Sequence, residues 1–139
     1  DARHALLCFL RWRQTGDDRY KELVLKTADR YLSALPETKD RALTPKTLAP
    51  VMGLLHGAYR ISRDPKYLSQ SEALADLALN HLFEEDCPLP YATQWREKYP
   101  YYASISYGDS LALMFLELAL LRNGGVEEVD RLGVECSIR

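Results

Sequence analysis

The chain contains few cysteines, and no two of them are closely spaced. Cys8, Cys87 and Cys136 are far apart among its 139 residues, and no C-x-x-C pair occurs. A zinc ribbon needs such pairs and a disulfide framework needs a denser set, so both classes are excluded. The cysteines do not by themselves define a cellular compartment.

Several motifs of common enzymes are absent as well. The sequence has no G-x-x-x-x-G-K-[ST], G-x-G-x-x-G, H-E-x-x-H or G-x-S-x-G. Nucleotide-binding, dinucleotide-binding and zinc-protease functions therefore lose their usual evidence. The acidic cluster of Glu84, Glu85 and Asp86 beside Cys87 is typical of a solvated helix end, so we expect neither a metal ion nor a cofactor.

The sequence also lacks an excess of charge of one sign and any long apolar run. Its 18 basic and 20 acidic residues are spread along the chain and leave a net charge of −2. Such a chain has no field that would attract nucleic acid or an anionic membrane, so neither is an expected partner. The longest apolar stretch, residues 111–121, is interrupted by Glu117 and is shorter than the roughly 20 residues of a membrane span.

The sequence begins with Asp1-Ala2-Arg3 instead of Met, and no charged and apolar leader precedes the first helical stretch. We therefore expect the chain to be a fragment of a longer protein. Its 139 residues, 47% of them hydrophobic, are enough for a single domain with a core, which we place at residues 1–139.

An internal repeat is the most informative feature that is present. Residues 5–32 recur at residues 52–79, a shift of 47 positions, so that Trp12 aligns with Tyr59 and Tyr20 with Tyr67. A repeat of this length with a turn in its middle is typical of stacked helix pairs. The sequence therefore predicts an all-α fold.

Apolar residues at spacings of three and four, together with breaks at Gly and Pro, predict where the helices lie. The expected helices are residues 2–14, 20–35, 47–62, 66–83, 109–122 and 126–131, with Pro36 ending the second. They form antiparallel hairpins at about 2–35, 47–83 and 109–132. The third hairpin matches the first two poorly in sequence.

The connections between the helices alternate in length. The first and third helices are followed by turns of about three residues, whereas the second and fourth are followed by residues 37–46 and 84–108. Because successive helices are antiparallel, both long connections should emerge at one end, beside the N-termini of the third and fifth helices. Helix N-termini carry partial positive charge, so this face suits carboxylates and other anions.

Hairpins of about 47 residues, with the turn TGDDRY at 15–20 and its echo SRDPKY at 62–67, resemble those of the six-hairpin glycosidase-like α/α toroids. That group includes unsaturated glucuronyl hydrolases and α/α-barrel polysaccharide lyases. The resemblance implies that the first, third and fifth helices form an inner ring. It also implies that a carbohydrate, including uronic acids, binds at the end where the two long connections lie, which we call the long-loop face. A protein of this group would be periplasmic or secreted.

A closed ring of this kind has six hairpins, and this chain supplies about three. The resemblance therefore implies that the remainder of the chain, or a second copy, completes the ring. An open half would expose the apolar sides of inner helices, so we expect Leu111, Phe115 and Leu118 to need a partner surface.

The long connection at 84–108 is rich in aromatic residues. Rings with flat apolar faces suit stacking on sugars, while Gln94, Arg96 and Glu97 could hydrogen-bond hydroxyls or carboxylates. The alternative is that the rings only fix a long loop to the helices. The expected substrate-binding residues are Tyr91, Gln94, Trp95, Arg96, Tyr99, Tyr101 and Tyr102.

Three residues are candidates for catalysis: Asp109, Glu97 and Tyr107. The simplest role of Asp109 is to cap the helix that follows it, and its functional alternative is a general acid or base paired with Glu97 in a glycoside hydrolase. A lyase instead needs a base such as Tyr101, Tyr102 or Tyr107 and a cation such as Arg96.

His56 lies among apolar residues of the third helix, where we expect a buried, hydrogen-bonded structural histidine. The function expected from the sequence is thus part of a polysaccharide lyase or glycoside hydrolase. The alternative is a helical-repeat module, like a TPR stack, that binds a protein without catalysis.

Overall fold

The computed structural model describes residues 1–33, 42–102 and 107–132, and in these parts of the chain the regular structure is helical. Six helices follow one another: α1 (Ala2–Thr15), α2 (Asp18–Asp29), α3 (Pro45–Ser62), α4 (Lys66–Leu82), α5 (Gly108–Arg122) and α6 (Val126–Leu132). The all-α prediction is confirmed. The predicted stop at Pro36, the first half of the first long connection (residues 37–41) and Cys136 lie outside the described residues.

The prediction for the second helix was wrong at its C-terminal end, because α2 ends at Asp29 and not near residue 35. The backbone N–H of Tyr31 donates to the carbonyl of Ala28 at 2.9 Å, and that of Leu32 to the carbonyl of Asp29 at 3.3 Å. Bonds between residues three apart tighten the chain into a turn that an α-helix cannot continue. The apolar spacing of these residues persists beyond the helix and so concealed its end.

The two short turns are equivalent in backbone conformation. Gly16 ends α1 with φ of 69°, and Arg63 ends α3 with φ of 61°. The N–H of each donates at 2.7 Å to the carbonyl four residues earlier, that of Trp12 in the first turn and that of Tyr59 in the second. This is the left-handed C-terminal cap of an α-helix, repeated 47 positions later.

The helices that follow these turns also begin in the same way. An Asp17 side-chain oxygen accepts from the N–H of Arg19 at 3.0 Å, and Asp64 accepts from the N–H of Lys66 at 3.0 Å. In both turns an aspartate therefore satisfies one of the open N–H groups at the start of a helix. The repeat predicted from sequence is thus confirmed in its hydrogen bonds.

Tyr20 and Tyr67 hold equivalent backbone positions but differ in their surroundings. Their N–H groups donate to the carbonyls of Asp17 and Asp64, at 3.1 and 3.4 Å. Tyr67 is buried and its hydroxyl donates to Asp29 at the end of α2, at 2.9 Å, whereas Tyr20 is only half-buried. Burial and the Asp29 carboxylate raise the pKa of Tyr67. The second hairpin therefore uses this position to pack on the first.

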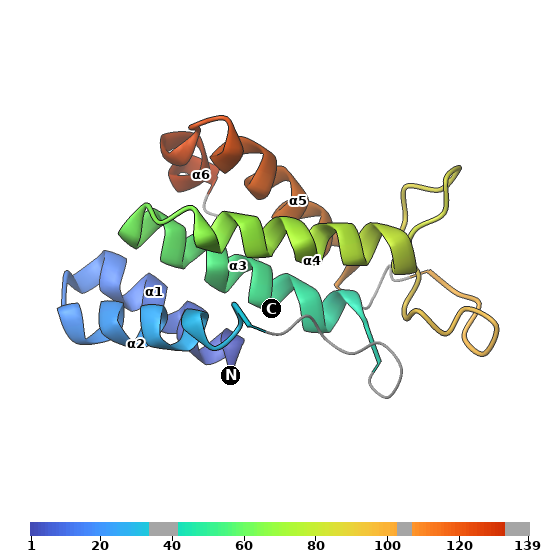
Figure 1. Cartoon of the computed structure of the whole chain (residues 1–139), viewed down its shortest axis with the longest axis horizontal. Helices are drawn as coiled ribbons and strands as arrows, with labels where there is room; N and C mark the ends of the chain where they lie inside the picture. The colour runs from blue at the N-terminus through green and yellow to red at the C-terminus, as the bar shows by residue number, and fades with distance from the viewer. Residues whose placement is uncertain (34–41, 103–106, 133–139) are drawn as a thin grey trace.

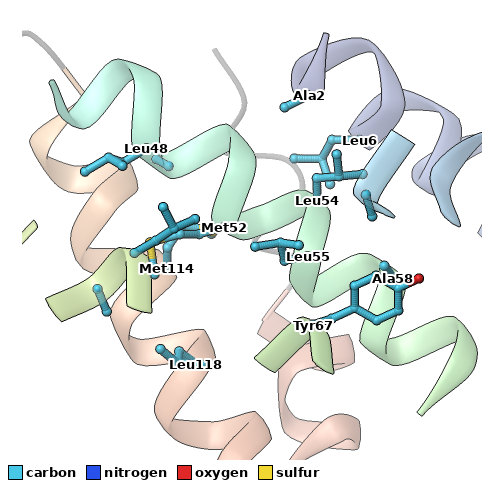
Figure 2. Close-up of a cluster of buried hydrophobic side chains, with 14 of the residues drawn as sticks. Ala2, Leu6, Leu48, Met52, Leu54, Leu55, Ala58, Tyr67, Met114 and Leu118 are labelled. Atoms are coloured by element: carbon cyan, nitrogen blue, oxygen red, sulfur yellow. The ribbon is translucent and has the colours of Figure 1, made fainter. Parts of the chain in front are cut away.

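The helices form two layers with α3 at the centre (Figure 1). α1, α3 and α5 follow one another in a row, α2 packs on α1 and α3, and α4 packs on α3 and α5. Figure 2 shows the core where these helices meet, with buried apolar side chains from α1, α3, α4 and α5: Ala2, Leu6, Leu48, Met52, Leu54, Leu55, Ala58, Tyr67, Met114 and Leu118.

Two glycines allow α1 and α3 to approach closely. A Cβ added to Gly53 would lie 3.1 Å from Leu6 and 3.2 Å from Met114, and one added to Gly57 would lie 3.2 Å from the Phe9 ring. The order of these contacts along both helices shows that α1 and α3 run in the same direction. Gly53 is thus the point where the first, third and fifth helices meet.

The described part of the first long connection, residues 42–44, lies at the same end of the molecule as the second, as the sequence predicted (Figure 1). The N–H of Leu43, just before α3, donates at 2.6 Å to the side-chain oxygen of Gln94 in the second long connection. The short turns at Gly16 and Arg63 lie at the other end of the helices. This arrangement places residues 84–102 of the second long connection, which we call the aromatic loop, beside the N-terminus of α3.

The expectation that Leu111 and Leu118 need an outside partner was wrong. Leu111 is fully buried and Leu118 is 7% exposed, because α3 and α4 cover them. Phe115 is half-buried and packs on Phe83, with ring centroids 5.8 Å apart. The large apolar side chain that α5 leaves in solvent is Leu116, at 49% exposure. Within the described parts of the chain, none of the helices combines the length and apolar character that a membrane crossing requires.

Candidate functional site

Arg96 fastens the aromatic loop to the end of α4. One of its terminal nitrogens donates to the carbonyl of Phe83 at 2.7 Å, and its Nε donates to the carbonyl of His81 at 3.3 Å. His81 lies in the last turn of α4 and Phe83 follows the helix, so neither carbonyl has a partner within it. The guanidinium also lies over the Tyr91 ring, 4.8 Å from its centroid. Arg96 therefore has a structural role, and its predicted contact with a substrate remains a prediction.

Gln94 fastens the same loop to the segment that precedes α3. Its side-chain oxygen accepts from the N–H of Leu43 at 2.6 Å and from the Thr93 hydroxyl at 2.9 Å. Thr93 is itself buried. A loop held at both α4 and α3 can present its remaining side chains in a fixed arrangement.

Contacts between Tyr91 and Tyr102 hold two parts of the loop side by side. Their rings are stacked with centroids 4.8 Å apart, and the two residues form an isolated antiparallel bridge. The Tyr91 hydroxyl donates to Glu84 at 2.8 Å. Hydrogen bonds to Tyr91 and then to the Cys87 thiol raise the pKa of Tyr102. Tyr102 is therefore tied to its neighbours by its hydroxyl as well as by its ring.

Three rings of the loop, that of Tyr102 among them, are partly open to solvent. The exposed fractions are 39% for Trp95, 56% for Tyr101 and 39% for Tyr102. Tyr99 is half-buried and lies edge-on to Tyr101, with centroids 6.1 Å apart. Residues 94–98 line an open hollow of about 660 Å³ beside Trp95. The sequence left two roles open for these residues, stacking on a sugar or packing of the loop. Some side chains fix the loop, whereas the exposed rings remain accessible to a ligand.

Tyr107 is the point where the N-terminal turns of α1, α3 and α5 converge. It precedes α5 with φ of 66°, a backbone conformation that is uncommon for a residue with a side chain. Arg3 of α1 lies 4.9 Å and Lys46 of α3 lies 5.7 Å from its ring centroid. Cations at such distances are attracted to an aromatic ring. The sequence suggested Arg96 as the cation near a catalytic tyrosine, and it missed Arg3 and Lys46.

The two carboxylates proposed for catalysis are both exposed. Asp109 is the second residue of α5 and accepts from the N–H of Ser110 at 2.8 Å, whereas Tyr107 occupies the position before the helix that we had expected for Asp109. Glu97 lines the hollow beside Trp95. Contacts among the described residues do not join Glu97 to Asp109, so their pairing remains a prediction.

His56 is a buried, hydrogen-bonded histidine, as predicted. Its Nε2 lies 2.7 Å from the Ser71 hydroxyl oxygen, and its Nδ1 lies 2.9 Å from a Glu117 oxygen. Arg60, one turn along α3, reaches the other Glu117 oxygen at 3.5 Å and also pairs with Asp130 of α6. The cluster therefore links α3, α4, α5 and α6 through paired charges and hydrogen bonds.

The order Ser71, His56 and Glu117 resembles the arrangement of a nucleophilic serine with its base. However, Ser71 and His56 are fully buried and Glu117 is 3% exposed, so no substrate reaches the hydroxyl. In this structure the cluster is closed to substrate, and its contacts join four helices. Sequence reasoning missed Ser71, Arg60 and Glu117. A single charge inside the apolar stretch of α5 was the available signal that a buried partner exists.

The described residues contain no group of three or more His, Cys, Asp or Glu side chains that could hold a metal ion. Comparisons with protein-family models, with curated proteins and with solved structures give no significant match to this chain.

Proposed function

We propose that the chain is part of a carbohydrate-active enzyme of the α/α-toroid type, with an oligosaccharide bound on the long-loop face. The support is the repeated hairpin, the row of α1, α3 and α5, and the gathering of both long connections at one end. α1 and α3 run in the same direction, as inner helices of such a ring do. The remaining hairpins would come from further chain or from a second copy.

The observation that carries the proposal is the exposure of Trp95, Tyr101 and Tyr102 on a fastened loop. An exposed ring is usually mobile, and ordering it on binding opposes association. Here Arg96 and Gln94 hold the loop before any ligand arrives. A flat apolar face with a polar edge then matches the alternating apolar faces and hydroxyls of a sugar.

The chemistry that we favour is elimination at a uronic acid, with Tyr107 as the group that transfers the proton. The proton on the carbon beside the sugar carboxylate passes to the base, the C–O bond to the next sugar breaks, the departing oxygen takes a proton, and a double bond forms in the ring. Arg3 and Lys46 supply positive charge beside Tyr107, which favours the negative charge that develops during this reaction.

Hydrolysis by Glu97 and Asp109 is the alternative chemistry. It differs in its product, because a hydrolase adds water whereas a lyase leaves an unsaturated sugar end. Product analysis with an oligogalacturonate substrate distinguishes the two. Loss of turnover in Tyr107→Phe with an unsaturated product from the parent protein supports elimination, and a saturated product excludes it.

Binding itself is tested by replacing Trp95 with alanine. We expect Trp95→Ala to weaken oligogalacturonate binding by about tenfold, equivalent to about 1.4 kcal/mol, because one stacking face is lost. Isothermal titration calorimetry measures the change, and circular dichroism checks that the helices persist. Leu89→Ala is the matched control, since Leu89 is an exposed apolar residue of the same loop without a ring. Equal affinity of Trp95→Ala and the parent protein would contradict the proposal.

A repeat-protein function without catalysis is the second candidate, and it is favoured by the hydrogen-bond equivalence of the two short turns. Such a module would bind a peptide along its row of helices. Saturable sugar binding in the titration above separates the two, because a peptide-binding array has no need of the exposed rings on the loop.

A further inference from the structure

A second cavity, of about 450 Å³, lies at the N-terminal ends of α1 and α3. Most of the side chains around it are apolar and come from four separate segments of the chain. They include Ala2, Tyr31, Leu48, Pro50, Val51 and Leu74. A cavity of this size and character is typical of a small-molecule site.

Two cations share this cavity with the apolar residues. Arg3 and Lys46 both line it, against the single carboxylate of Asp1. The Asp1 side chain already accepts from the N–H of Arg3 at 3.0 Å and lies 3.4 Å from the His4 ring. The N-terminal ends of α1 and α3 add partial positive charge. The polar part of the cavity is therefore suited to an anion.

Arg3 supplies the sharper indication. One terminal nitrogen of its guanidinium is buried and has no hydrogen-bond partner among the described residues. A buried charged donor without an acceptor is destabilising, and native proteins rarely retain one. Because Arg3 lines the cavity, a small rotation of its side chain would bring this enclosed nitrogen to a ligand oxygen.

We propose that this cavity binds an amphipathic carboxylate of the medium-chain fatty acid class. The carboxylate accepts a hydrogen bond from Arg3 and pairs with Lys46, and the hydrocarbon chain packs on the half-exposed side chains of Tyr31, Pro50 and Val51. A sugar would lose hydrogen bonds against such walls, and an inorganic anion would leave them uncovered. The inference does not rest on sugar binding at the loop, but Arg3 and Lys46 are also the cations beside Tyr107 in the elimination proposed above, so a fatty acid and a uronic acid would compete for them.

Octanoate is the probe for this site, with two matched comparison ligands. 1-Octanol has the same chain without the charge, and glucuronate has the charge without an apolar chain. We expect calorimetry to show saturable binding of one octanoate per chain, with each comparison ligand at least tenfold weaker. Arg3→Gln should weaken octanoate binding by at least tenfold, because it removes the charge while keeping a polar side chain. Arg11→Gln, an exposed arginine of the same helix, is the control and should have no effect.

Val51→Trp is a second variant that should also weaken octanoate binding, because the larger side chain fills the cavity without removing a charge. Intermolecular NOEs in the parent protein, between octanoate methylenes and the side chains of Tyr31 and Val51, provide evidence that does not depend on any variant folding. Absence of these NOEs at saturation, octanol binding as tightly as octanoate, or unchanged octanoate affinity in folded Arg3→Gln would overturn the proposal. Trp95→Ala should leave octanoate binding unchanged, so failure of one proposal is distinguishable from failure of the other.

Discussion

Single residues are expected to contribute most to the stability of this protein where a charge is buried together with its partners. Glu117 is the acceptor for both His56 and Arg60, and all three side chains are nearly inaccessible to water. Removing one member of such a group leaves the others charged or polar in a medium that cannot solvate them. The cluster is therefore more sensitive to the loss of one member than an exposed ion pair is.

We expect Glu117→Leu to lower the free energy of unfolding by about 3–5 kcal/mol, because Arg60 and His56 lose their acceptor. Urea denaturation followed by circular dichroism measures this change. Glu72→Leu is the control, since Glu72 pairs with Arg122 at 2.6 Å on the surface and its loss should cost less than about 1 kcal/mol. Similar losses in the two variants would show that burial does not set the strength of the cluster.

Sequence reasoning identified residue types better than residue partners. It identified His56 as buried, because a polar ring among apolar residues of a helix has few other locations. It did not find the fastening role of Arg96, because the carbonyls of His81 and Phe83 become acceptors only when α4 ends and the loop folds back over it. Contacts of this kind depend on chain geometry that periodicity does not contain.

At the scale of elements, the two short turns differ in one residue that matters. Gly16 and Arg63 have nearly the same left-handed conformation, but only glycine adopts it without steric cost. No atom lies within 4 Å of a Cβ built on Gly16, so the difference between the turns is one of backbone conformation and not of packing.

We expect Arg63→Gly to raise the free energy of unfolding by about 1 kcal/mol, and Gly16→Arg to lower it by about 1 kcal/mol. Thermal unfolding of both variants is the measurement. The contact of Arg63 with the Tyr59 ring, at 6.0 Å, is weak. Its loss in Arg63→Gly should only make the increase in the free energy of unfolding smaller. A loss of stability in Arg63→Gly would show that the side chain contributes more than the strain costs.

Helix starts and the two short turns could be predicted because they depend on local signals, such as aspartate before a first turn and glycine after a last one. The end of α2 could not, since Tyr31 and Leu32 keep the apolar spacing of a helix after the backbone has tightened. The position of Tyr107 was missed for a related reason. Asp109 is the better capping residue by type, yet the chain enters α5 through a left-handed tyrosine whose ring lies near both Arg3 and Lys46.

For the whole molecule, α5 is a helix with apolar residues on its solvent side. Its buried side faces α3 and α4, and its solvent side carries Ala112, Leu116 and Ala119 where a surface helix normally carries polar residues. In the ring that we propose, another hairpin would cover this side.

If the isolated chain uses this side to associate, Leu116→Glu should shift it to the monomer, because a charge at the centre of an apolar contact opposes burial. Sedimentation equilibrium measures the shift. Leu23→Glu is the control, since Leu23 is a similarly exposed leucine on α2 surrounded by polar residues. A parent chain that is monomeric and fully active on uronic-acid polymers would contradict the requirement for further hairpins.

The central claim is that the long-loop face binds sugar, and the two tryptophans of the chain provide its most direct test. Trp95 lies on the loop, whereas Trp12 lies on α1 near the short turn at the opposite end. An NMR titration with oligogalacturonate follows both indole N–H signals in one sample. We expect the Trp95 signal to move in a saturable way while the Trp12 signal stays in place. A Trp95 signal that does not move at saturating sugar, or equal movement of both signals, would contradict the account.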